Sequence, residues 1–227
     1  RIYSSALMTM IVGILVLQPD IGMTLMVVLT WGFQMFLAGM PMLLVICIVA
    51  LAPLGLVVAY FTLGHVHKRI NQFWEGGAWQ VEKARDSFAN GGLFGVGPGD
   101  GTVKHHLPDA HSDFIFAVAG EEFGALACLT LLTLYAFIVL RGFSRAMSDE
   151  GLFCLIASAS LLLQFGVQAA IHMASSVHLI PTKGMTLPLI SYGGSSLVAS
   201  GLTMGLILAL TRRRAPYSLP GRRHLQE

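Results

Sequence analysis

Apolar residues run through this chain in long uninterrupted stretches, and polar residues collect between them. A helix that crosses the hydrocarbon core of a bilayer needs about 20 mainly apolar residues. This criterion predicts spans near residues 3–17, 21–39, 42–64, 117–140, 152–179 and 191–211. We therefore expect an all-α integral membrane protein with about six transmembrane helices, in which residues 1–211 form a polytopic membrane domain.

Composition agrees with a membrane location. The 227 residues are 55% hydrophobic and 11% charged, and their mean hydropathy is +0.71. Soluble domains carry about 25% charged residues, so the bilayer is the expected solvent. The net charge of +2 offers no basic surface for nucleic acid. Cys47, Cys128 and Cys154 lie in apolar stretches and have neither disulfide-framework nor metal-ligand spacing.

The basic residues near the predicted helix ends indicate the orientation. Short cytoplasmic loops are enriched in Lys and Arg. Arg141 and Arg145 flank one short loop, and five arginines lie in the tail at 212–227. Both regions are expected to be cytoplasmic, so the C-terminus forms a cytoplasmic basic tail. The long segment 65–112 and the loop 180–190 are then both extracytoplasmic.

The large loop at 65–112 is too long for a simple connection and is expected to carry function. Apolar residues between positions 79 and 88 recur at helical spacing, and Gly91–Gly92 supply a stop, which predicts a short amphipathic helix over the membrane surface. The glycine-rich stretch 91–101 would let backbone N–H groups approach an anion such as pyrophosphate. It follows no strand, so a plain turn is the favoured alternative.

Asp113 stands at the start of a predicted membrane helix. Ser112 or Asp113 could simply cap that helix. The residues that share the helical face of Asp113 are small: Ala117, Gly120 and Gly124. This stripe leaves room beneath the carboxylate for a closely packed helix or for a water-filled cavity.

Other polar residues lie deeper in the predicted spans. Glu121 and Glu122 enter the same span about two turns after Asp113. On the next helix Gln164, Gln168 and His172 are spaced i, i+4, i+8 and share one face. Ionisable groups at membrane depth are functional candidates unless they are paired internally. The glutamine and histidine stripe either bonds to neighbouring helices or lines a hydrophilic groove.

Two further groups of residues raise the question of ligands. The residues His105, His106, Asp109, His111 and Asp113 suggest a divalent cation, but their spacing matches no structural zinc pattern and a solvated loop is favoured. No metal site or cofactor is therefore predicted, and a divalent cation stays an open alternative.

Lys183 is the only Lys or Arg between Arg145 and Arg212, and prolines at 181 and 188 bracket it. The side chain could simply snorkel to water from the membrane interface. A rigid turn that presents one cation beside an acid-bearing cavity fits an anionic phosphate ligand better.

Sequence blocks around these residues resemble the SEDS family of shape, elongation, division and sporulation proteins. The blocks are Leu17–Gly22, Asn90–Gly95, Leu107–Val118, Gly120–Gly124 and Pro181–Ser196. They span nearly the whole chain and are closer to the FtsW division branch than to the RodA elongation branch. Members usually have ten spans, so this chain, which opens at Arg1 without an initiating Met, is expected to match spans five to ten. Ser112 stands where Thr is usual, and His172 replaces an Asn-containing pattern.

The resemblance implies a peptidoglycan glycosyltransferase that polymerises lipid II into glycan strands during septal cell-wall synthesis in bacterial cell division. It implies a multi-pass protein of the bacterial inner membrane at the division septum, which works with a class B penicillin-binding protein and other divisome proteins. Asp113 occupies the position of the family's essential Asp and is the expected catalytic residue. The expected substrate-binding residues are Lys183, Arg85, Lys104, Gln80, His111, Thr182 and Ser191.

Two other functions stay open. A lipid II flippase would need a polar path open to both faces, whereas the charges here cluster on the expected outer side. A non-catalytic divisome scaffold would use helix-face glycines such as Gly201 and Gly205. It would leave Asp113 and Lys183 with only capping and snorkelling roles.

Overall fold

The computed structural model describes residues 2–18, 21–41, 43–44, 57–58, 60–62, 64–74, 79–148, 151–181 and 184–212. These residues form helices and connecting turns without a strand, which confirms the all-α prediction. The helices are α1 (Ile2–Leu17), α2 (Ile21–Leu37), α4 (Gly64–Trp74), α5 (Trp79–Gly91), the 3-10 helix η1 (Val103–His106), α6 (Ile115–Ala146), α7 (Leu152–Ser176) and α8 (Gly194–Leu210).

Five of the predicted spans coincide with apolar helices. Within the described part of the chain, α6 and α7 are long and apolar enough to cross a bilayer, and α1, α2 and α8 are shorter apolar helices. The predicted span at 42–64 lies largely outside the described residues, and so does the tail from residue 213 onward. The number of spans and the orientation of the tail therefore stay predictions.

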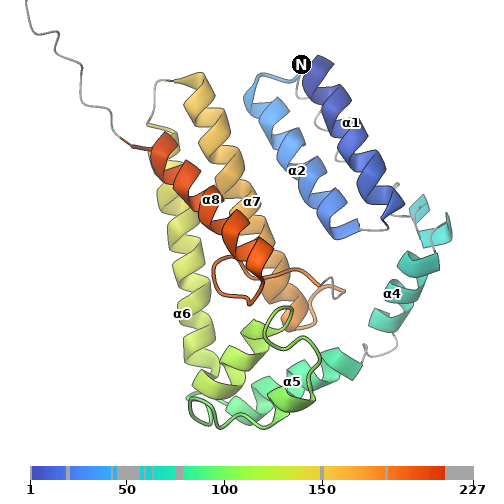
Figure 1. The fold of residues 1–227 in the computed structure, drawn as a ribbon, viewed down its shortest axis with the longest axis vertical. Coiled ribbons are helices and arrows are strands. Elements are labelled where there is room, and N and C mark those ends of the chain that lie inside the picture. The colour runs from blue at the N-terminus through green and yellow to red at the C-terminus, as the bar shows by residue number, and fades with distance from the viewer. Residues whose placement is uncertain are drawn as a thin grey trace, which may run out of the picture.

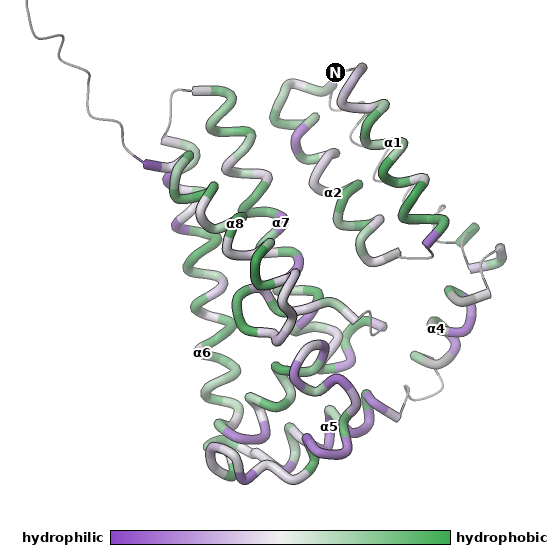
Figure 2. Tube along the Cα trace, in the orientation of Figure 1, coloured by the Kyte–Doolittle hydropathy of each residue, from purple (hydrophilic) through white to green (hydrophobic). Residues whose placement is uncertain are grey.

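The helices form two packed groups. Helices α6, α7 and α8 make one group, and α1 and α2 form a hairpin that packs on α7 through α2 (Figure 1). The amphipathic helix predicted around residues 79–88 is present as α5, which lies across one end of α6 and α7. Hydrophilic residues concentrate in α5 and the loop that follows it, while the bundle helices are mainly hydrophobic (Figure 2).

Small residues bring α6 and α7 together. A Cβ added to Gly142 would lie 2.4 Å from Leu162 Cδ2, and one added to Gly166 would lie 2.9 Å from Val139 Cγ2. Small residues allow close approach of helices in a bilayer, where the hydrophobic effect does not drive their association. The buried core at this contact consists of Phe116, Cys128, Tyr135, Phe165, Ala169, Met173 and Leu187.

Helix α6 is broken at Gly124, whose φ of 79° and ψ of −180° are not helical. The glycine-rich segment after α5 fills the break. The amide of Val96 donates to the carbonyl of Glu121 at 3.0 Å, and the amide of Gly97 donates to that of Glu122 at 3.0 Å. Unpaired backbone groups are costly in a bilayer, so the segment satisfies carbonyls that a continuous helix would have bonded itself.

The amides beyond the break are satisfied in the same way. Ala125 donates to the carbonyl of Gly92 at 2.9 Å, and Leu126 donates to that of Leu93 at 3.3 Å. A Cβ added to Gly124 would lie only 2.4 Å from Leu93 O. The glycine-rich stretch is therefore a turn that interlocks with α6, in agreement with the plain-turn alternative. Because the amides of residues 96 and 97 bond to α6, they are not available to an anion.

Candidate functional site

Asp113 lies two residues before α6 and is partly buried. The N-cap of α6 is Phe114, and no side chain caps this helix, so capping does not account for Asp113. Burial raises the pKa of Asp113 above its ordinary value, a hydrogen bond with Ser112 lowers it, and the charge of Asp109 raises it. The net effect is a carboxylate with increased proton affinity, as a general base near neutral pH requires.

The loop between α7 and α8 reaches the carboxylate of Asp113. A Cβ added to Gly184 would lie 3.0 Å from Asp113 Oδ2. The backbone of the loop at Gly184 therefore lies directly beside the carboxylate. Gly184 has a φ of 50°, which also favours glycine. Thr182 and Lys183 lie outside the described residues, and Lys183 directly precedes Gly184 in the sequence. The fold thus brings the loop that carries this lysine to Asp113.

Side chains of α7 fasten this loop. The Nδ1 of His172 donates to the carbonyl of Met185 at 2.6 Å, and His172 is fully buried. The Nε2 of Gln168 donates to the carbonyl of Thr186 at 3.0 Å. Of the polar stripe, His172 and Gln168 thus bond to this loop, and Gln164 and Gln168 line cavities.

Hydrogen bonds also tie the loop to the turn before α6. The hydroxyl of Ser191 donates to the carbonyl of Ser112 at 2.6 Å and accepts from the amide of Leu187 at 2.7 Å. The amide of Tyr192 donates to the carbonyl of His111 at 2.9 Å. Ser191 is only 4% exposed, so its position favours holding Asp113 in place over direct contact with a ligand.

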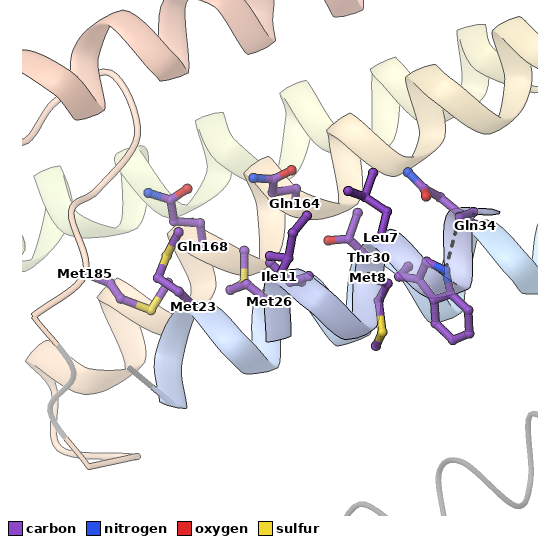
Figure 3. Close-up of a pocket in the computed structure, with 13 residues that line it drawn as sticks. Leu7, Met8, Ile11, Met23, Met26, Thr30, Gln34, Gln164, Gln168 and Met185 are labelled. Atoms are coloured by element: carbon purple, nitrogen blue, oxygen red, sulfur yellow. Dashed lines mark hydrogen bonds between the residues drawn. The ribbon is translucent and has the colours of Figure 1, made fainter. Parts of the chain in front are cut away.

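Two adjoining cavities follow the polar face of α7. The first, of about 240 Å³, lies between the α1–α2 hairpin and α7, and its lining includes Gln164, Gln168 and Met185 (Figure 3). The second, of about 270 Å³, lies between α7 and α8. Both include Met23 and the two glutamines, and the second includes Gly184. Together they form a mainly apolar groove, which we call the α7 groove. It reaches Gly184, the loop residue that lies against Asp113.

A third cavity, the polar cavity, has a volume of about 410 Å³. It is lined by Lys104, His105, Leu107, Asp109, Ala110, His111, Ser112 and Tyr192. Ser112 borders it and is the chain neighbour of Asp113. The structure therefore places two predicted substrate-binding residues, Lys104 and His111, in one cavity with the residue that precedes Asp113 in the chain.

The other predicted residues differ in their surroundings. The ammonium of Lys104 pairs with the Glu122 carboxylate and donates to the carbonyl of Gly99 at 3.1 Å. Arg85 is exposed on α5 and forms no ion pair with the described residues, and Gln80 is partly buried near the start of the same helix. Arg85 and Gln80 are absent from the lining of the polar cavity. The described residues contain no group of three His, Cys, Asp or Glu that could hold a metal ion.

Sequence reasoning missed several residues that shape the site. Tyr192 borders the polar cavity, and the hydroxyl of Tyr135 donates to the carbonyl of Pro188 in the loop. Gly184, which lies against Asp113, is 71 positions further along the chain. No periodicity or motif signals contacts of this range, although the positive-φ requirement of Gly184 gives a weak local hint.

The sequence of this chain matches a known protein family. The family described as "Cell cycle protein", which comprises FtsW, RodA and SpoVE, matches residues 1–215. A protein of Caulobacter vibrioides named "Probable peptidoglycan glycosyltransferase FtsW" is 43% identical over 206 residues, which cover 89% of this chain and 53% of that protein. The "Peptidoglycan glycosyltransferase RodA" of Mycobacterium leprae is 34% identical over 219 residues, covering 94% of this chain and 47% of the relative.

A solved structure has the same fold. It is described as "Structural coordination of polymerization and crosslinking by a peptidoglycan synthase complex", and it matches with a TM-score of 0.72 and 27% identity. The match covers 93% of this chain and 62% of that one. The chain thus spans about half the length of the curated relatives that it matches.

Proposed function

Because this chain belongs to the FtsW, RodA and SpoVE family of cell cycle proteins, we propose that it carries the reaction centre of a peptidoglycan glycosyltransferase that polymerises lipid II. The observation that carries the proposal is the contact of Gly184 with the Asp113 carboxylate. It brings a candidate base to the loop that bears Lys183, between Gly184, which lines the apolar groove, and Ser112, which lines the polar cavity. Relatives named as peptidoglycan glycosyltransferases support this chemistry.

In the proposed reaction, the 4-hydroxyl oxygen of one sugar forms a bond to the anomeric carbon of another. The bond from that carbon to the undecaprenyl pyrophosphate breaks, and the electron pair leaves with the pyrophosphate. Asp113 accepts the proton of the attacking hydroxyl, a step that its raised proton affinity favours. Lys183, together with the exposed Arg85, neutralises the departing charge.

The two kinds of cavity fit the two ends of such a substrate. The α7 groove is lined mainly by apolar side chains such as Met23 and Met185, which suits a polyprenyl chain. The polar cavity holds Lys104, His111 and Tyr192, which suits sugar hydroxyls and phosphates. The substrate head would then lie over Asp113 with its tail along α7.

We propose that the protein works in the bacterial inner membrane at the division septum, with its reaction centre on the outer face. The partner would be a class B penicillin-binding protein, together with other divisome proteins. The structural match to a complex that coordinates polymerization and crosslinking supports such a partner. The 43% identity to the Caulobacter relative named FtsW supports the division branch.

The test is a lipid II polymerisation assay on the full-length protein that contains this chain, purified with its penicillin-binding partner. We expect Asp113→Asn to reduce glycan-strand synthesis by about 10² to 10⁴-fold while lipid II binding is retained, because only proton transfer is removed. Lys183→Ala is expected to reduce both binding and turnover.

The control is Gly205→Ala on α8, where an added Cβ meets nothing within 4 Å. It should leave synthesis unchanged. Wild-type strand synthesis by well-folded Asp113→Asn would refute the base assignment. Lipid II transport across vesicles with no polymer from the wild type would favour a flippase, and septal localisation with neither activity would favour a scaffold.

A further inference from the structure

Glu121 is a charged side chain of α6 that the proposed reaction does not use, and its side chain is 0% exposed. Four donors bond to its carboxylate. Asn90 Nδ2 and the amides of Thr102 and Val103 donate to Oε1 at 2.9, 2.8 and 2.8 Å. The amide of Lys104 donates to Oε2 at 3.0 Å.

The partners of Glu121 indicate its chemical state. Three of the four are backbone N–H groups, which can only donate, and the fourth is the side-chain amide nitrogen of Asn90. A protonated carboxyl would need an acceptor for its own hydrogen, so the arrangement fits the ionised form. Consecutive backbone amides that converge on one point make an anion-binding concavity. Here the anion is a side chain of the protein itself.

The Glu121 carboxylate therefore anchors the turn that contains η1 to α6. Gly101 packs directly against it, because an added Cβ would lie 3.0 Å from Glu121 Cδ and 3.1 Å from its Oε2. The neighbouring Glu122 pairs with the ammonium of Lys104. The backbone hydrogen bonds on both sides of Gly124 hold residues 92–97 of the same loop against α6. The first turns of α6 and the loop from residue 92 to residue 106 are thus joined by hydrogen bonds and an ion pair and should move together.

This anchored turn supplies one wall of the polar cavity. Lys104 and His105 line that cavity from the turn, and His111 and Ser112 line it from the segment that leads into Asp113. The distance between the two walls depends on where the turn is held. Binding sites need such walls to be preorganised, because a displacement of about 1 Å lowers activity strongly.

We propose that Glu121 is a positioning residue that holds the Lys104–His105 wall of the polar cavity at the spacing that the sugar-pyrophosphate head of the substrate requires. This rests on the proposed function for the identity of the ligand, but the anchoring itself does not. Glu121 acts through the turn and touches neither the substrate nor Asp113.

The first test measures the turn directly and is independent of activity. The side chain of Lys104 is 12% exposed while the turn is held on α6. We therefore expect trypsin to cleave after Lys104 only when the turn separates from α6. In Glu121→Gln, the amide NH₂ replaces one acceptor oxygen and faces donors. We expect cleavage between residues 104 and 105 in proteoliposomes to accelerate about tenfold or more. Cleavage after Lys83 should not change.

Two further variants complete the test. Gly101→Ala keeps the charge of Glu121 but pushes its carboxylate aside, and we expect the same selective cleavage. Glu82→Gln is the matched control, because Glu82 is an exposed acid on α5 and is not among the ion-paired residues described. Its cleavage pattern should equal that of the wild type. Gly101→Ala also decides the matter if Glu121→Gln fails to fold.

The second test uses lipid II polymerisation by the full-length protein with its partner. We expect Glu121→Gln to raise KM about tenfold and to lower kcat far less, because Asp113 is held separately through Ser112 and Ser191. In a Lys104→Ala, His105→Ala background the same change should add little, since the wall through which Glu121 acts is already absent.

Two outcomes would overturn the proposal. One is unchanged protection of Lys104 in both Glu121→Gln and Gly101→Ala. The other is a loss of kcat that is additive with the wall variants, which would assign Glu121 to the chemical step or to global stability. If the wild type makes no polymer, the proposed function fails while the proteolysis result still decides the anchoring.

Discussion

At the scale of single residues, the surroundings of Asp113 combine burial with a second acid. Burial raises the pKa of Asp113, the hydrogen bond with Ser112 opposes this, and the negative charge of Asp109 adds to the rise. Asp109 is exposed and lies on the wall of the polar cavity. The negative charge of Asp109 therefore contributes to the proton affinity of Asp113.

This arrangement predicts a pH effect of a defined sign. A base must be deprotonated, so kcat/KM should fall as the pH drops through the pKa of Asp113, which lies above the ordinary 3.8. Asp109→Asn removes a like charge, which makes deprotonation of Asp113 easier. We expect the acidic limb of the polymerisation profile to move to lower pH. The measurement is kcat/KM against pH for both proteins.

Asp86→Asn serves as the control for this shift, because Asp86 is an exposed acid on α5 that pairs with Lys83. Its acidic limb should coincide with that of the wild type. A limb that moves to higher pH in Asp109→Asn would contradict the assigned electrostatics.

At the scale of elements, the break in α6 is the feature that arranges the site. A continuous helix would bond its own carbonyls at Glu121 and Glu122, but here the amides of Val96 and Gly97 take them. The break also lets the glycine-rich segment run close to the helix, since an added Cβ on Gly95 would lie 2.1 Å from Glu122 O. Helix α6 and the loop therefore depend on each other for their backbone hydrogen bonds.

The break predicts a large effect of Gly124→Ala. The alanine would need a φ near 79°, and its Cβ would lie 2.4 Å from Leu93 O. Left-handed or otherwise rare backbone conformations cost about 1–3 kcal/mol, and the clash adds to this. We expect a marked fall in the thermal midpoint of the purified protein, measured by tryptophan fluorescence or by a thiol-reactive dye.

Gly201→Ala in α8 provides the comparison. Gly201 has helical surroundings, and nothing lies within 4 Å of an added Cβ. Alanine is the better helix former by about 1 kcal/mol, so this variant should be as stable as the wild type or more so. Equal midpoints for the two variants would argue against the interlock.

At the scale of the whole molecule, polar chemistry gathers at one end of an apolar bundle. The described charged residues of α5, η1 and the turn before α6 lie at that end, and Arg141 and Arg145 lie near the far end of α6 (Figures 1 and 2). The positive-inside rule would place the arginine end in the cytoplasm. The site would then face outward.

Cysteine labelling tests this orientation. In a full-length background with Cys47, Cys128 and Cys154 replaced by Ala, we expect His105→Cys to react with a membrane-impermeant maleimide in intact spheroplasts. Ser148→Cys, in the turn after α6, should react only after permeabilisation. The inverted pattern would reverse the proposed orientation and move the site to the cytoplasmic face.

Local features of this molecule could be predicted from sequence because their causes are local. Helices α1, α2, α6, α7 and α8 follow from runs of apolar residues, and α5 follows from its helical spacing and its glycine stop. Asp113 stood out for a similar reason, as an acid directly before a long apolar run. Hydropathy and backbone propensity act over a few turns, so the order of residues is sufficient to indicate these elements.

The tertiary structure decided which of these elements meet and what each polar group does. Ser191 bonds to Ser112 across 79 positions, and Glu121 receives amides from residues 17 to 19 positions away. In a bilayer, buried polar groups must find partners inside the protein, and many pairings satisfy that demand equally well. Only the packing of α5, α6 and α7 selects among them, which is why Glu121 is an anchor and why Gly184 lies against Asp113.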